Sequence, residues 1–185
     1  MRREASTHEE INAAWVDGAP VLNSTVHLAE YDPRWPALFE REARRVRSLL
    51  GDLVLRLDHV GSTSVPGLAA KPIVDMLLVV PDPADEESYV APLEAAGYRL
   101  VIREPDRHEH RALKGPDTNI NLHVHPPTSP DIERMLAFRD RLRADDADRD
   151  LYERTKRELA SRTWTYIQEY ADAKSAVVDD ILTRA

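Results

Sequence analysis

The stretch H-V-G-S-T-S-V-P-G-L-A-A-K-P-I-V-D-M-L-L-V-V, from His59 to Val80, decides how this chain folds. Its second half, Ile73 to Val80, is a continuous apolar run of strand length, which is typical of a strand buried on both faces of a sheet. One acid, Asp75, lies inside the run, and a buried carboxylate is costly unless it is paired or binds a cation. We therefore expect a central strand whose acid is held by a neighbouring arginine or by a bound cation.

The first half of the stretch is a strand end followed by a small, hydroxyl-rich turn. Gly61 permits close approach of the backbone, and the N–H and hydroxyl groups of Ser62, Thr63 and Ser64 can bind a ligand. Gly-Ser turns are common, so the turn alone is weak evidence. The spacing brings the turn and Asp75 together at one edge of the sheet, however, and a phosphate-holding turn that leads to an acid on a strand is typical of a nucleotidyltransferase site.

The composition is that of an ordinary soluble globular protein. The chain has 185 residues, 42% hydrophobic and 31% charged, which is enough for one domain with a proper core. It has no cysteine, so disulfides and thiolate metal sites are excluded. A net charge of −8 argues against general nucleic-acid binding, although a local basic pocket remains compatible with it. No apolar run is long enough to span a bilayer and no signal region follows the start, so we expect a cytoplasmic protein without a membrane partner.

Periodicity and capping signals predict the remaining elements. Residues 1–24 form a polar N-terminal extension, either a packing arm or a loose tail, in which Thr7 and Glu10 make a capping-box-like start to a short helix. Residues 25–185 are expected to form a single domain. Strands are predicted at residues 26–30, 53–60, 98–103, 108–114 and 118–125, and helices from Asp32 to Gly51, at 85–96, from Ser129 onward, at 147–162 and at 164–183.

The last two strands read as a hairpin, and the second strand alternates between two faces. An apolar face suits packing on the sheet, and a polar face would look into a cleft or into solvent. A further histidine, His59, ends the strand before the turn, as a core residue that bonds the turn or as an active-site group. The apolar residues of the second hairpin strand are Ile120, Leu122 and Val124, and the polar ones are Asn119, Asn121, His123 and His125.

Four cationic side chains are predicted at inward-facing positions or close to the turn, where each needs an anionic partner. Arg139 and Lys174 lie on the inward stripes of predicted helices, Lys71 follows the turn, and Lys156 lies on the second C-terminal helix. Each could form a structural ion pair, or several could converge on the turn as a phosphate site, because arginine offers a planar fork and lysine a point charge.

The chain closely resembles the GrpB family, also called UPF0157. The residues that carry the resemblance are the 59–75 stretch, Y-D-P-R-W-P at 31–36, N-L-H-V-H at 121–125 and L-A-F-R-D at 136–140. The resemblance runs from about Val26 to the C-terminus. It implies an α+β fold of the nucleotidyltransferase superfamily, with a mixed sheet, flanking helices and a C-terminal helical bundle. It implies little about activity, and related domains are also found fused to dephospho-CoA kinase.

The superfamily pattern is incomplete here. Gly61, Ser62 and Asp75 match its turn and first acid, but the second acid, expected two residues later, is Leu77. A magnesium site of oxygen ligands therefore lacks donors. Asp75, His123 and His125 suit zinc, manganese or iron instead, or the histidines act as a general base without metal, or they face solvent.

We therefore expect a protein that binds a nucleotide or another phosphorylated small molecule and transfers a nucleotidyl group to a small acceptor. The phosphates would be held by the turn with Lys71, Lys156, Lys174 and Arg139, and Asp75, His123 and His59 would be the catalytic residues. The alternatives are a non-catalytic folding or assembly module, or a histidine–carboxylate metalloenzyme with another reaction.

Overall fold

A five-stranded mixed sheet forms the centre of the molecule. The computed structural model describes residues 5–184, and its sheet has the order β1-β2-β5-β4-β3. Only β2 and β5 run parallel, and the other neighbours are antiparallel, so the expected α+β class is confirmed. The strands are β1 (Arg56–Val60), β2 (Val74–Val79), β3 (Arg99–Glu104), β4 (His110–Lys114) and β5 (Ile120–His125).

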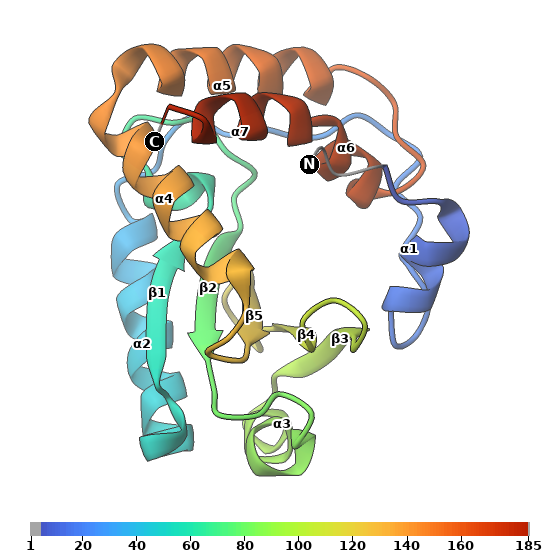
Figure 1. Cartoon of the computed structure of the whole chain (residues 1–185), viewed down its shortest axis with the longest axis vertical. Helices are drawn as coiled ribbons and strands as arrows, with labels where there is room; N and C mark the ends of the chain where they lie inside the picture. Colours follow the sequence, from blue (N-terminus) through green and yellow to red (C-terminus); the bar gives the residue numbers. More distant parts are fainter. Residues whose placement is uncertain (1–4, 185) are drawn as a thin grey trace.

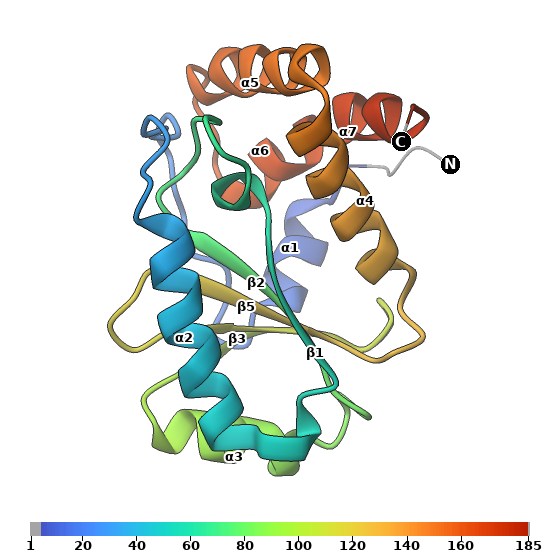
Figure 2. The ribbon, with the colours of Figure 1, turned by 90° about the vertical axis from the view of Figure 1, so that its left-hand side faces the viewer.

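One face of the sheet is covered by α2 (Trp35–Leu50) and α3 (Glu86–Ala95), as Figures 1 and 2 show. Alternate residues of each strand point to this face, so the alternation predicted for β5 is confirmed, and the apolar run of β2 is buried on both faces as expected. Gly51 ends α2 with φ of +53°, as its position predicted. The main core includes Trp35, Phe39, Val46, Leu57, Met76, Leu78, Leu113, Leu122 and Val124.

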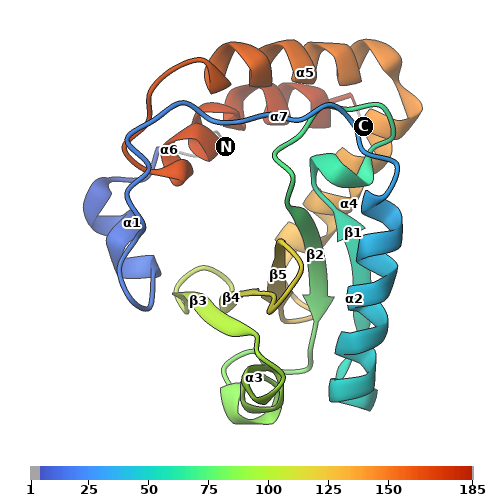
Figure 3. The same cartoon turned by 180° about the vertical axis from the view of Figure 1, so that it is seen from behind.

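The other face is only partly covered. Helix α4 (Pro130–Ala144), capped by Ser129 as expected, packs Ile132 and Leu136 against Leu77 of β2. The chain continues through α5 (Asp146–Ala160), α6 (Ile167–Ala173) and α7 (Ser175–Leu182), which lie away from the sheet, at the top of Figures 1 and 3. The part of this face formed by β2, β5 and β4 is left for the cavity described below.

The N-terminal segment is a packing arm. Helix α1 (His8–Ala14) begins with the predicted capping box of Thr7 and Glu10. Beyond it, Trp15 forms an antiparallel bridge with Ile102 of β3, the edge strand of the sheet. The arm therefore lies between the sheet edge and the C-terminal helices, on the right in Figure 1.

Three local predictions are wrong. Residues 26–30 form no strand, because their backbone bonds go to separate elements, such as Val26 N–H to Ala160 O and the bridge of Ala29 with Ala70. A 3-10 turn over residues 51–53 replaces the start of the predicted strand at 53–60. The last predicted helix is broken at Lys174, whose N–H bonds the carbonyl of Ala171 three residues back, and this tight turn separates α6 from α7.

Two smaller features also differ from expectation. Asp32 does not cap α2; its carboxylate accepts from Arg34, and the helix begins at Trp35. His108 lies in the turn before β4 with φ of +51°, so it is not in the hairpin strand. Across residues 5–184, the helices are all too short or too polar to cross a bilayer.

Candidate functional site

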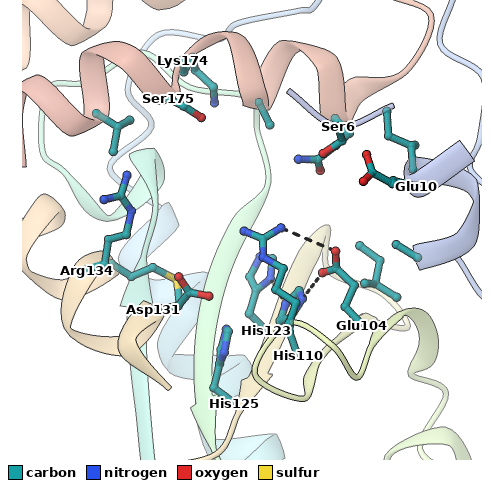
Figure 4. Close-up of a pocket in the computed structure, with 18 of the residues that line it drawn as sticks. Ser6, Glu10, Glu104, His110, His123, His125, Asp131, Arg134, Lys174 and Ser175 are labelled. Carbon is teal, nitrogen blue, oxygen red and sulfur yellow. Dashed lines mark hydrogen bonds and ion pairs between the residues drawn. The ribbon is translucent and has the colours of Figure 1, made fainter. Parts of the chain in front are cut away.

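Two adjoining cavities lie between the uncovered sheet face and the helices α4, α6 and α7. The smaller has a volume of about 430 Å³, and we call it the lysine cavity, because Lys71, Lys114, Lys156 and Lys174 line it. The larger, of about 620 Å³, is the histidine cavity, lined by His110, His123 and His125. Figure 4 shows this larger cavity, with Lys174 above it and the three histidines below. Both cavities share lining residues, including Trp15, His123, Gln168 and Lys174.

The four lysines of the lysine cavity are all the lysines that the chain has. Its other basic residues are arginines, and most of these form ion pairs elsewhere. One carboxylate, Asp75, faces the four amines. Since four amines surround one acid, protonation of more than one of them gives the lysine cavity an excess of positive charge, although the whole chain is acidic.

Burial has made these amines less basic than usual. It lowers the pKa of Lys156 to about 7 and that of Lys174 to about 8. Burial also lowers the pKa of Lys71 and Lys114, and Lys174 adds charge repulsion at Lys71. Lys174 lies 4.5 Å from the centre of the Tyr170 ring, and the hydroxyl of that tyrosine is buried with no hydrogen-bond partner among residues 5–184. An anion would stabilise the charged amines.

Asp75 is held by uncharged and cationic neighbours. Its Oδ1 accepts from the side-chain amide of Asn121 at 2.7 Å and lies 3.6 Å from Nε2 of His123. Burial acts to raise the pKa of Asp75, but its bond and charge interaction with His123 and the charge of Lys71 outweigh this, so the pKa lies below its usual value. Asp75 is therefore ionised at neutral pH, and no arginine pairs with it among the contacts of residues 5–184.

The predicted turn and acid do lie together. Gly61 has φ of +69°, and a Cβ at this position would be 2.5 Å from Oδ2 of Asp75. The glycine is thus required for close packing against the acid. Ser62 faces the lysine cavity, and its hydroxyl accepts from Nζ of Lys156 at 3.0 Å. Lys156 also donates to the carbonyl of Ala69, which fixes the amine beside the turn.

The other hydroxyls of the turn are used internally. Thr63 borders the lysine cavity, but its hydroxyl bonds Nε2 of His59 at 3.0 Å. Ser64 donates to the carbonyl of Gly61 at 2.6 Å and does not line either cavity. Of the turn residues predicted to bind phosphate, Gly61, Ser62 and Thr63 line the lysine cavity, and only Ser62 turns its hydroxyl to it.

His59 and Arg139 lie apart from both cavities. His59 stacks on Phe39 of α2 at 4.9 Å, and burial lowers its pKa to about 4, so it is a neutral core histidine at pH 7. Arg139 bonds Asp140, the carbonyl of His59 and Asp58. Of the two predicted catalytic histidines, His123 lines both cavities and His59 lines neither; the predicted phosphate-binding Arg139 also lines neither, because it bonds partners around β1.

A chain of hydrogen bonds runs across the sheet face. Oε2 of Glu104 lies 2.6 Å from Nδ1 of His110, whose Nε2 lies 3.1 Å from Nδ1 of His123. His123 in turn faces Asp75. If Glu104 is ionised, it accepts the Nδ1 proton of His110, and Nε2 of His110 then accepts the Nδ1 proton of His123. Nε2 of His123 is left without a proton, so a hydrogen bond from it to Asp75 requires one further proton. This row of side chains therefore connects the histidine cavity with the lysine cavity.

The expected metal ligands are not brought together. His125 is buried and its Nδ1 bonds the hydroxyl of Ser129 at 3.1 Å, while its ring stacks on His110 at 4.8 Å. In the described part of the chain, no three His, Asp or Glu side chains form a group that could hold a metal ion. Asp75 and His123 supply one carboxylate and one imidazole, and the other neighbours of Asp75 are an amide and amines, so the donors are too few for a magnesium, manganese or zinc site.

Several residues of the site had not been identified from sequence. Lys114 of β4 and Asn121 of β5 lie opposite each other, and Asn121 also pairs with Asp75 of β2. The hairpin was predicted, but only its register shows that both residues lie beside Asp75. Glu104 and Trp15 come from the sheet edge and the arm, and neither carries a local motif. Tyr152 borders the lysine cavity next to Ser62, and burial raises its pKa to about 12.

Comparisons with known proteins agree on one family. The family described as GrpB protein matches residues 25–184. A UPF0157 protein of Halalkalibacterium halodurans is 58% identical over 179 residues, covering 97% of this chain and 92% of that protein. A dephospho-CoA kinase of Mycolicibacterium paratuberculosis is 31% identical over 89% of this chain, but this region is only 47% of the kinase.

One solved structure supports the same relationship. The crystal structure of the conserved protein GrpB from Enterococcus faecalis has a TM-score of 0.75 and is 34% identical in sequence. The match covers 85% of this chain and 96% of that one. The arm, in residues 1–24, precedes the family match, although the Halalkalibacterium relative aligns with part of it because it covers 97% of the chain.

Proposed function

This chain belongs to the GrpB family, and from that premise we propose that its lysine cavity binds a small phosphorylated molecule. The observation that supports the proposal most is that every lysine of the chain lines this one cavity, around a single carboxylate. Amines confined at this density repel one another, and an anion with two or more charges would offset both the repulsion and the loss of hydration.

The position of the charge favours a small ligand over a polymer. The lysines line a recessed cavity, whereas nucleic-acid binding needs a basic outer surface, and the chain carries a net charge of −8. Ser62 and the amine of Lys156 lie 3.0 Å apart at the turn, so a phosphate oxygen can accept from both. We place the phosphate at Ser62, Lys156, Lys71 and Lys174, with Lys114 on the Asn121 side.

A nucleotidyltransferase-like fold and activity are narrower proposals. Their support is the turn between antiparallel strands and the adjacent acid. Leu77, at the place of the second acid, is fully buried against Ile132 and Leu136 of α4, so apolar packing occupies that position. Since the donor set does not suit a divalent metal, any transfer would rely on lysine charge, with the pair Asp75–His123 accepting the proton of the acceptor hydroxyl.

A second candidate function is an accessory module. Its support is the similarity to about half of a dephospho-CoA kinase. In this role the cavity would hold a phosphorylated molecule without changing it. A binding assay does not separate the two candidates, but product formation from a nucleoside triphosphate does, because only a transferase releases pyrophosphate.

Isothermal calorimetry with pyrophosphate and with each nucleoside triphosphate, with and without magnesium or manganese, tests the proposal. We expect at least one of these anions to bind, and Lys156→Met and Lys174→Met to weaken its binding by about tenfold or more. The matched control is Arg162→Gln, which removes a cation from an exposed site. Absence of binding by all of these anions would contradict the proposal, as would equal losses in the control.

A further inference from the structure

The cavity space next to the lysines is larger than a phosphate group alone would fill. The histidine cavity adjoins the lysine cavity and is the larger of the two, at about 620 Å³. A ligand whose phosphates reach Ser62 and Lys156 therefore extends past Lys174 and Gln168, which line both cavities. The walls of this shared region determine what the rest of the ligand can be.

These shared walls are aromatic and apolar. Trp15, Met135 and Phe138 line both cavities, and Trp15 is the largest flat surface among them. Trp15 is only half-buried, so part of its ring system has no protein cover. Tryptophan side chains that are partly buried at cavity walls contribute large contact area to flat or apolar groups.

The arm that carries Trp15 is fixed at both ends. Ile11 is 3% exposed, and the backbone N–H of Ser6 donates to Asp172 of α6 at 2.8 Å. At the other end, Val16 N–H bonds the carbonyl of Val101 at 3.1 Å, so the arm extends the sheet at β3. Figure 3 shows α1 closing the open side between the sheet edge and α6. Trp15 is thus held in place by anchors, of which only Val101 itself lines the lysine cavity.

The histidine cavity also has a different charge from the lysine cavity. Its walls include Glu10, Glu104, Asp131 and Asp179, with Arg107, Arg134 and the shared Lys174 as cations. Arg134 contacts Asp179, and Arg107 lies 3.6 Å from Glu104. A second strongly anionic group would therefore be repelled here, whereas an uncharged flat group would be accepted.

We propose that Trp15 is a specificity-determining residue, which contacts an uncharged flat or apolar part of a phosphorylated ligand whose phosphates lie among the lysines. This inference rests on the proposed function. It adds that the N-terminal arm, which precedes the region matched by the family, selects the ligand. The phosphate end is recognised by charge, and the other end by the arm.

Binding of matched diphosphates tests the inference. Pyrophosphate carries only the anionic part, while ADP, UDP and dephospho-CoA carry a diphosphate with a flat or extended uncharged part. We expect at least one of the three to bind the unmodified protein more tightly than pyrophosphate. Trp15→Ala should weaken that ligand about tenfold and leave pyrophosphate within about twofold, and Trp15→Phe should keep most of the affinity.

The control variant is Val16→Ser, the exposed neighbour of Trp15, which should change neither affinity. Equal losses for both ligands in Trp15→Ala would overturn the inference, because they indicate only structural damage to the arm. No loss for either would also overturn it, as would three organic ligands that bind no better than pyrophosphate. If pyrophosphate and all three fail to bind the unmodified protein, it is the proposed function that fails.

Discussion

Lys156→Met gives a prediction whose sign changes with pH. Lys156 is 2% exposed, and burial lowers its pKa from 10.5 to about 7. In the unfolded chain the amine keeps its usual pKa, so folding releases its proton between about pH 7 and pH 10.5. The charged amine therefore destabilises the folded state fully below pH 7, and this penalty disappears as the pH rises toward 10.5.

The magnitude follows from the same shift. At about 1.4 kcal/mol per pKa unit, the penalty is about 4 kcal/mol at pH 7 and about 1 kcal/mol at pH 10. Lys156→Met removes the penalty, but it also removes the bonds to Ser62 and Ala69, which costs about 2 kcal/mol. We expect the variant to be more stable than the unmodified protein by about 2 kcal/mol at pH 7 and less stable by about 1 kcal/mol at pH 10.

Urea unfolding of both proteins at pH 7 and pH 10, followed by circular dichroism, measures this difference. Effects of other groups cancel because the two proteins are compared at each pH. A variant that is less stable at pH 7 by the same amount as at pH 10 would refute the reasoning, since it would show that Lys156 carries no burial penalty. A stabilised variant that no longer binds anions would indicate that the amine is kept for binding at a cost in stability.

Three further predictions concern the same site. ADP, whose phosphates are ionised above about pH 7, should bind less tightly at pH 9 than at pH 7.5. The bound anion favours the protonated forms of Lys156 and Lys174 and so raises their pKa, and at pH 9 deprotonation of these amines weakens the attraction. Calorimetry at the two pH values measures the affinity, and an unchanged affinity would contradict the prediction. Gly61→Ala should lower the free energy of unfolding by about 2 kcal/mol or more, because the new Cβ would meet Asp75, and urea unfolding checks this. Glu104→Leu should change the ¹⁵N chemical shifts of both His110 and His123, since it removes the acceptor that sets their tautomers; unchanged shifts for His123 would show that the two imidazoles are not coupled.

The central part of the fold could be predicted because its signals are local. The apolar run at β2, the alternation of β5 and the glycine stop of α2 each depend on a few neighbouring residues, and all three are confirmed. The meeting of Gly61 with Asp75 was also predictable, because β1 and β2 are joined by the turn itself and Val60 pairs with Asp75.

The rest of the site depends on contacts between distant segments. Trp15 reaches the cavity only because the arm pairs with Ile102, and no pattern near residue 15 indicates this pairing. His59 and Arg139 had motif positions that suited an active site, but Thr63 of the turn satisfies His59, and Asp58, Asp140 and the carbonyl of His59 satisfy Arg139. Lys114 could have been found from composition, because a chain with four lysines offers few candidates for a cation cluster.

The most direct test of the central claim uses the same scarcity of lysine. Acetylation by a limiting amount of acetic anhydride, followed by mass spectrometry of the peptides, gives a rate for Lys71, Lys114 and Lys174 separately, with an added lysine peptide as reference. If the lysine cavity holds a phosphorylated ligand, saturating pyrophosphate or ADP should slow acetylation of all three relative to the peptide. Equal rates with and without both anions would contradict the claim that these amines form an anion site.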